Sequence, residues 1–183
     1  MPEPAHSTTG SQPITPNSAA DRLAANAEAI RALATCVSAE QARWRPSDEA
    51  WSLLETVCHL ADEEREDFRV RLEFTLQRPG EAWPPIDPAG WVHDRAYNTR
   101  DLAGRLTDFL SARAENLTWL RGLGEPDQGT AYAHPQWGPI PAGDLLAAWL
   151  AHDQLHLRQL TELHFAWTKH VAAPFDVRYA GEW

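Results

Sequence analysis

Two histidines that could bind a common ion, His152 and His156, stand four positions apart in the stretch LAHDQLH. Residues at this spacing lie one helical turn apart on the same face, so both imidazoles can reach one cation. Leu145, Trp149 and Leu163 extend that face, which predicts that both rings point inward between apolar neighbours. A buried imidazole needs partners for both ring nitrogens, and a shared cation satisfies two rings at once. The alternative is that each is an ordinary core histidine bonded to protein groups.

A third donor is expected elsewhere, because a metal with only two protein ligands is usually held weakly. His59 is the best candidate, since it lies early in the helical stretch WSLLETVCHLADEERE with apolar residues on either side. The remaining histidines fit less well, because they fall in the N-terminal lead, in proline-rich loops or near the end of the last helix: His6, His93, His134, His164 and His170.

Glu63 is the candidate for a catalytic or supporting carboxylate, because it lies one turn after His59. It could orient a ligand ring, bind the ion or accept a proton. The surrounding acidic run DEERED is equally typical of solvated surface, and most of it is expected there. Asp153 fits the zinc-protease pattern H-E-x-x-H poorly, since Asp is shorter than Glu. Cys58 is expected to pack in the core, because consecutive helical residues point about 100° apart.

Four helices must position these residues, and their sequence signals predict an all-α four-helix bundle with long proline-rich connectors. Ser52 and Glu55 predict a capping box at the start of the second helix. The connector between the second and third helices, about 20 residues, is long enough to span the bundle, so both a long crossover and a simple up-and-down order are possible. No strand alternation is evident. The predicted helices run from Asn17 or Ser18 to about Val37, from Ser52 to about Arg78, from about Thr99 to Leu123, and from Pro141–Asp144 to beyond Trp167.

The chain therefore divides into three parts. Residues 1–16 are rich in Pro, Ser and Thr and are expected to form a disordered lead. Residues 17–171 form the bundle. Residues 172–183 form a tail whose Phe175, Tyr179 and Trp183 are expected to pack back onto it.

The composition of the 183-residue chain excludes some classes of binding partner. Its formal net charge of −10 argues against a nucleic-acid surface, which needs clustered Lys and Arg. The cysteines, Cys36 and Cys58, lie inside apolar-periodic segments and are expected to be buried free thiols. No stretch approaches the roughly 20 apolar residues of a membrane span, and the N-terminus lacks a signal-peptide pattern. We therefore expect a cytoplasmic protein with no membrane or nucleic-acid partner.

The ordered set of short motifs resembles the DinB/YfiT-like superfamily of metal-binding four-helix bundles. The matching positions are the Trp-Ser pair opening the second helix, the His-Leu pair within it, and the H-x-x-x-H pair of the last helix with its following glutamine: Trp51, Ser52, His59, Leu60, His152, His156 and Gln159. The resemblance covers residues 17–167. It implies a divalent cation, commonly zinc or nickel, held by His59, His152 and His156 with open coordination positions. Homodimers occur in this superfamily.

The resemblance leaves the reaction open, because one bundle hosts several chemistries. Three neutral imidazoles leave the ion its full charge, which lowers the pKa of bound water towards about 7 or stabilises a thiolate. The leading hypothesis is transfer of a low-molecular-weight thiol, bacillithiol or mycothiol, to a small electrophile. The first alternative is a metal-dependent hydrolase, and the second is a non-enzymatic, stress-related protein that binds a metal or a small ligand.

Overall fold

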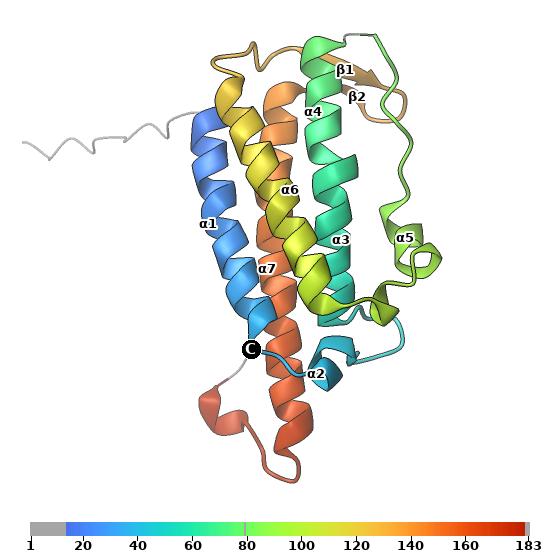
Figure 1. Ribbon diagram of the computed structural model, residues 1–183, viewed down its shortest axis with the longest axis vertical. Coiled ribbons are helices and arrows are strands. Elements are labelled where there is room, and N and C mark those ends of the chain that lie inside the picture. The colour runs from blue at the N-terminus through green and yellow to red at the C-terminus, as the bar shows by residue number, and fades with distance from the viewer. Residues whose placement is uncertain (1–13, 79, 182–183) are drawn as a thin grey trace, which may run out of the picture.

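The computed structural model describes residues 14–78 and 80–181, and its long helices form the predicted four-helix bundle (Figure 1). The second bundle helix consists of two consecutive segments, and short helices and one hairpin occupy the connectors. The bundle helices are α1 (Pro16–Thr35), α3 (Leu53–Glu66) with α4 (Phe68–Gln77), α6 (Leu102–Gly122) and α7 (Ala142–Ala172). The connectors carry α2 (Ala39–Arg43), α5 (Pro88–Asp94), η1 (Tyr97–Thr99), β1 (Ala131–His134) and β2 (Gly138–Pro141), and η2 (Arg178–Ala180) lies in the tail.

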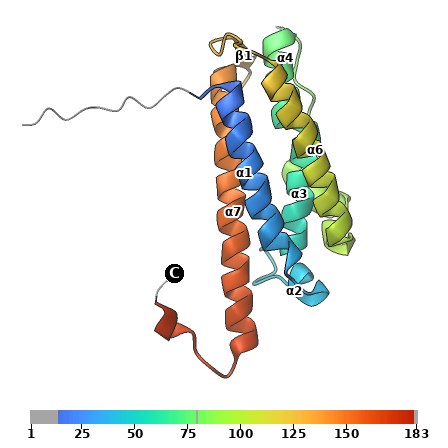
Figure 2. The same ribbon diagram turned by 60° about the vertical axis from the view of Figure 1, so that its left-hand side comes forward.

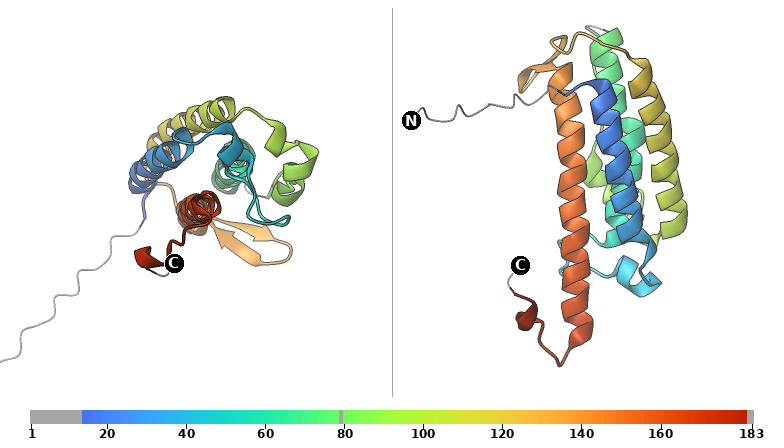
Figure 3. Two further views of the ribbon diagram at one scale, coloured as in Figure 1. Left: turned by 90° about the horizontal axis from the view of Figure 1, so that it is seen from below. Right: turned by 90° about the vertical axis from the view of Figure 1, so that its left-hand side faces the viewer.

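The helix order contains the long crossover that the sequence left open. Helices α1 and α7 run in one direction, whereas α3–α4 and α6 run in the other (Figure 1). The segment between α4 and α6 returns along the outside of the bundle and carries α5 and η1. Helix α1 packs against α6 and α7, and these two also contact α3, so the four helices surround a common core (Figure 3). The helices that carry the three candidate histidines, α3 and α7, are therefore neighbours.

The first helix begins earlier than predicted. Its N-cap is Thr15, not Asn17 or Ser18, and Pro16 occupies the first turn, where its fixed φ favours helix initiation. The Thr15 hydroxyl accepts from the Ser18 amide at 3.1 Å, and the Ser18 hydroxyl accepts from the Thr15 amide at 2.9 Å. Ile14 packs against the core, so the lead predicted for residues 1–16 extends too far. Residues 1–13, His6 among them, lie outside the described part of the chain.

The second bundle helix confirms its predicted start and breaks before its predicted end. The Ser52 hydroxyl accepts from the Glu55 amide at 3.2 Å, and the Glu55 carboxylate accepts from the Ser52 amide at 2.8 Å. The helix is interrupted at Asp67, whose backbone angles of −116° and −97° are not helical. The third bundle helix starts at Leu102 rather than Thr99, because the Asp101 carboxylate accepts from the Gly104 amide at 2.7 Å and caps it.

A two-stranded antiparallel hairpin precedes α7, in a loop where no strand was predicted. Its register pairs Ala131 with Pro141 and His134 with Gly138. Each strand has four residues, and β2 contains two prolines, which cannot donate to a ladder. Strands this short and rich in proline do not show the alternation of apolar and polar residues by which longer strands are predicted.

The tail turns back beside the end of α7, which extends past the other helices (Figure 2). Its Phe175 is 82% exposed and Tyr179 is fully exposed, so neither ring packs on the bundle as predicted. Trp183 lies outside the described residues. No helix in the described part of the chain combines the length and apolar character needed to cross a membrane.

Candidate metal centre

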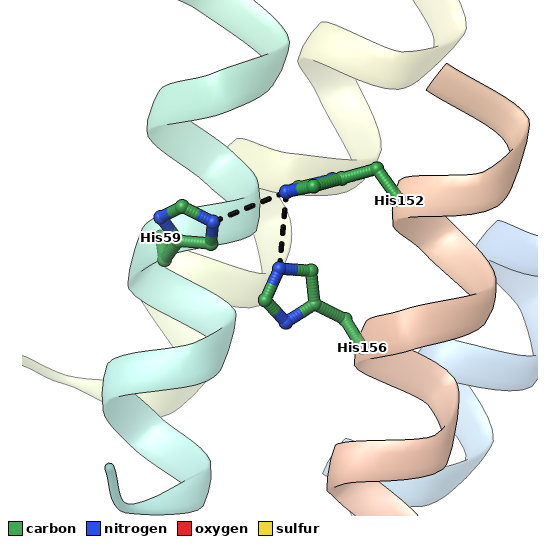
Figure 4. Close-up of side chains that lie close together, drawn as sticks. All are labelled: His59, His152 and His156. Carbon is green, nitrogen blue, oxygen red and sulfur yellow. Dashed lines mark hydrogen bonds between the residues drawn. The ribbon is translucent and has the colours of Figure 1, made fainter. Parts of the chain in front are cut away.

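Three histidines from two helices meet between α3 and α7 (Figure 4). The Nε2 atom of His152 lies 3.3 Å from Nε2 of His59 and 3.0 Å from Nε2 of His156. One nitrogen from each ring lies within 4.8 Å of the other two. The i and i+4 spacing on α7 brings the pair together, and the packing of α3 against α7 adds the third ring.

The three facing nitrogens do not satisfy one another. A neutral imidazole carries one N–H and one lone pair, and a single N–H shared at His152 cannot fully satisfy both His59 and His156. Converging lone pairs repel unless a proton or a cation lies between them. A divalent ion accepts all three lone pairs at once, so this donor set fits a metal.

The surroundings of the Nδ1 atoms of His156 and His59 determine which nitrogen of each ring carries the lone pair. The Nδ1 atom of His156 lies 2.8 Å from the Gln159 amide oxygen, which accepts its proton and leaves Nε2 as the free lone pair. The Nδ1 atom of His59 is buried without a hydrogen-bond partner. The closest carboxylate oxygen belongs to Glu63, at 3.9 Å, too far for a hydrogen bond. A small movement of Glu63 would supply the missing acceptor.

Burial keeps the rings neutral. It lowers the pKa of His59 to about 3, an effect reinforced by His156. It also lowers the pKa of His152 to about 2, with His156 and His59 adding to the shift, and it lowers the pKa of His156. Neutral imidazole is the form that binds metals, so the site favours cations over protons at neutral pH.

Aromatic rings and a cavity border the histidines. The Trp51 ring centre lies 5.0 Å from that of His59, and the Phe68 ring centre lies 4.9 Å from that of His152. A cavity of about 490 Å³, large enough for a small molecule, is lined by Trp51, which contacts His59, and by Gln159, which contacts His156, but not by the histidines themselves. Its lining comes from the connector before α3 and from the later turns of α7: Pro46, Glu49, Ala50, Trp51, Gln159, Glu162, Leu163 and Ala166.

The acidic run after His59 is mostly buried, which contradicts its predicted place at the surface. Asp62, Glu63, Glu64 and Asp67 are all buried, because α6, α7 and the connector helices pack around most of α3, whereas Arg65 in the same run stays exposed. Arginines neutralise part of this charge, three of them from later segments and one, Arg71, from the next turn of the chain. Arg95 and Arg105 bind Asp62, Arg71 binds Asp67, and Arg113 binds Glu64. The arginines on α6 were the one sequence feature that could have indicated buried carboxylates. Which carboxylate each arginine binds depends on tertiary packing, which the sequence alone does not show.

The less favoured candidates lie apart from the three-histidine cluster. The Asp153 carboxylate turns away from it and binds Arg113 at 2.7 and 2.8 Å. Cys58 is buried in the core as predicted, and burial raises the pKa of its thiol to about 11. Cys36 is exposed, contrary to the prediction, because it caps the end of α1. His164 bonds the Leu33 carbonyl at 2.8 Å through Nε2.

A four-helix bundle with a three-histidine cluster able to hold a metal defines the class of protein. The family model of the DinB superfamily matches residues 22–160, and the chain belongs to this superfamily. The fold is similar to that of YfiT from Bacillus subtilis, described as a probable metal-dependent hydrolase with an unusual four-helix bundle topology. The TM-score is 0.73 at 20% sequence identity, over 93% of each chain. A comparison with curated proteins found no match.

Proposed function

We propose that the protein is a metal-dependent hydrolase whose divalent ion, zinc or nickel, is held by His59, His152 and His156. The observation that carries the proposal is the convergence of three neutral imidazoles, one buried and two half-buried, whose nitrogens lie within 4.8 Å of one another. Imidazole donors suit these two metals. The description of YfiT as a probable metal-dependent hydrolase supports the choice of reaction.

When bound, such an ion supplies a nucleophile at neutral pH by lowering the pKa of coordinated water. The protein's own groups set the geometry around it. Gln159 holds the proton of His156 on Nδ1, so Nε2 keeps its lone pair. Glu63 takes the corresponding role for His59 once its carboxyl moves within hydrogen-bond distance. In this proposal Glu63 orients a ligand and does not touch the substrate.

The adjoining cavity receives the substrate. Its lining residues Trp51 and Gln159 contact His59 and His156, so the cavity is separated from the proposed ligands by one layer of side chains. Its two charged lining residues are Glu49 and Glu162, whereas Trp51 and Leu163 supply apolar surface. This lining favours a neutral or cationic substrate with an apolar portion over an anionic one.

Transfer of a low-molecular-weight thiol to an electrophile is the second candidate. It is favoured by the volume of the cavity, which is sufficient for a thiol cosubstrate as well as an electrophile. A neutral ligand set leaves the positive charge needed to stabilise a thiolate. The acidic lining, Glu49 and Glu162, favours a thiol cosubstrate without negative charge.

The two reactions are separated by assaying the metal-loaded protein against two substrate panels. We expect turnover of neutral or cationic model esters and amides, with little consumption of mycothiol, bacillithiol or cysteine in the presence of a model electrophile. Thiol consumption without ester or amide turnover would replace hydrolysis with transfer. The absence of both activities in zinc- and nickel-loaded protein would leave a binding protein.

Chelation provides the control for this assay. It should abolish turnover while most of the helical circular dichroism remains, because the packed apolar clusters stabilise the bundle without the ion. Loss of the helical signal would indicate a structural ion instead.

Replacing Glu63 with leucine is expected to weaken zinc binding about 10- to 100-fold, because partners of a metal ligand's second nitrogen typically contribute that much. Glu63→Gln, which keeps an acceptor oxygen, should have a smaller effect. Zinc affinity measured by competition with a fluorescent chelator checks this. Glu66→Leu is the matched control, since Glu66 bonds Arg95 at 2.7 and 3.0 Å. Equal affinities of Glu63→Leu and the wild type would remove Glu63 from the site.

A further inference from the structure

Arg113 is a fully buried cation that contacts both ligand-bearing helices. It lies on α6 and is only 1% exposed. Its Nη1 and Nη2 atoms donate to the two Asp153 oxygens at 2.7 and 2.8 Å, a bidentate pair. Nη2 also donates to the Glu64 carboxylate at 2.7 Å. One guanidinium therefore holds two carboxylates in fixed directions.

These carboxylates are close in sequence to the proposed ligands. Glu64 follows His59 by five residues on α3, and Asp153 directly follows His152 on α7. The bridge from Glu64 through Arg113 to Asp153 thus joins the two helices whose separation sets the distances among the three histidines.

Neighbouring polar groups complete the network. The Trp149 indole N–H donates to Glu64 at 2.8 Å, a second link between α7 and α3. The Asn116 amide donates to the other Glu64 oxygen at 2.9 Å, and the Asn26 amide donates to Asp153 at 3.1 Å. Arg113 also donates to the Leu23 carbonyl at 2.9 Å, so α1 takes part. All four bundle helices meet in this one network.

Such a network contributes more to specific geometry than to stability. Buried ion pairs recover little net free energy beyond their desolvation cost, whereas apolar packing alone permits small sliding movements. Metal ligands, in contrast, must lie within a few tenths of an ångström of ideal distances. A bridge with fixed directions between α3 and α7 meets that requirement.

We propose that Arg113 is a positioning residue, which sets the spacing between His59 and the His152–His156 pair through Glu64 and Asp153. The proposal rests on the proposed metal site. Lysine at this position would keep the charge, but its three donors lack the planar fork of guanidinium and cannot reproduce the four Arg113 bonds that include the bidentate Asp153 pair.

The test compares Arg113→Lys with Arg105→Lys, with cobalt(II) as a spectroscopic probe. Arg105 is a matched control, because it also lies on α6 and binds a buried α3 carboxylate, Asp62, but has no bond to α7. We expect Arg113→Lys to weaken cobalt binding at least about tenfold and to alter the visible d–d spectrum. Arg105→Lys should lower thermal stability yet keep the wild-type affinity and spectrum.

Three outcomes would overturn the proposal. The first is an unchanged cobalt affinity and spectrum in Arg113→Lys, and the second is an equal loss of cobalt affinity in Arg113→Lys and Arg105→Lys. If Arg113→Lys does not fold, the milder Asp153→Asn replaces it, and wild-type cobalt binding by Asp153→Asn is the third. The wild-type titration is read first. A wild type that binds no cobalt, zinc or nickel would contradict the metal site itself, which is a different failure from loss of positioning.

Discussion

Replacing His152 with alanine is expected to weaken zinc or nickel binding by more than about 100-fold, and His59→Ala and His156→Ala should do the same. His152 is central, because its Nε2 atom lies within 3.3 Å of both other Nε2 atoms. Removing any one ring leaves two ligands, too few for a tightly held ion. The measurement is metal content by elemental analysis after dialysis, followed by competition titration.

His164→Ala is the matched control for these variants. His164 lies on α7 eight residues after His156, so it shares the ligand-bearing helix. Its Nε2 atom bonds the Leu33 carbonyl at 2.8 Å, and its Nδ1 atom lies 3.2 Å from the Gln41 amide nitrogen. Both nitrogens thus have protein partners, and metal content should not change. Equal metal loss in all four variants would contradict the assignment of the ligands.

The candidate site was predictable because its signals are local or come from the family resemblance. Helical periodicity brings His152 and His156 to one face, and the apolar helical surroundings of His59 make it the best third candidate, in agreement with the resemblance. The structure brings all three rings together. Ser52 and Glu55 likewise form the predicted capping box, since both partners lie within one turn.

The features that the sequence did not predict depend on distant partners or on competing local signals. The acidic run after His59 resembles a solvated face, but Arg95, Arg105 and Arg113 from later segments pair with it in the interior. The break at Asp67 has no proline or glycine to mark it. At the first helix, Thr15 caps in place of the polar residues that follow Pro16.

The metal-free protein should lose stability as the pH falls below about 6.5, because of His59 and His152. Burial lowers the pKa of His59 to about 3 and that of His152 to about 2, so both rings remain neutral in the folded protein. In the unfolded chain they take up protons near pH 6.5. The unfolded chain binds more protons in this pH window. As the pH falls, each histidine therefore lowers the free energy of unfolding by up to about 1.4 kcal/mol for every pH unit.

Glu63 has the opposite effect. Burial and the neighbouring Asp67 raise the pKa of its carboxyl, so the folded protein keeps a proton that the unfolded chain loses above its ordinary value of 4.5. This group stabilises the fold at low pH, and its contribution is lost as the pH rises. The wild-type pH profile is therefore a sum of opposing slopes, and single variants are needed to separate them.

Urea unfolding with chelator present, at a series of pH values between about 4.5 and 6.5, makes this separation. His152→Gln should flatten the rise of unfolding free energy with pH by up to about 1.4 kcal/mol per pH unit, and Glu63→Gln should steepen it. Parallel curves for His152→Gln and the wild type would show that this ring titrates alike in both states. Its burial, and with it the selectivity of the centre for metal over protons, would then be contradicted.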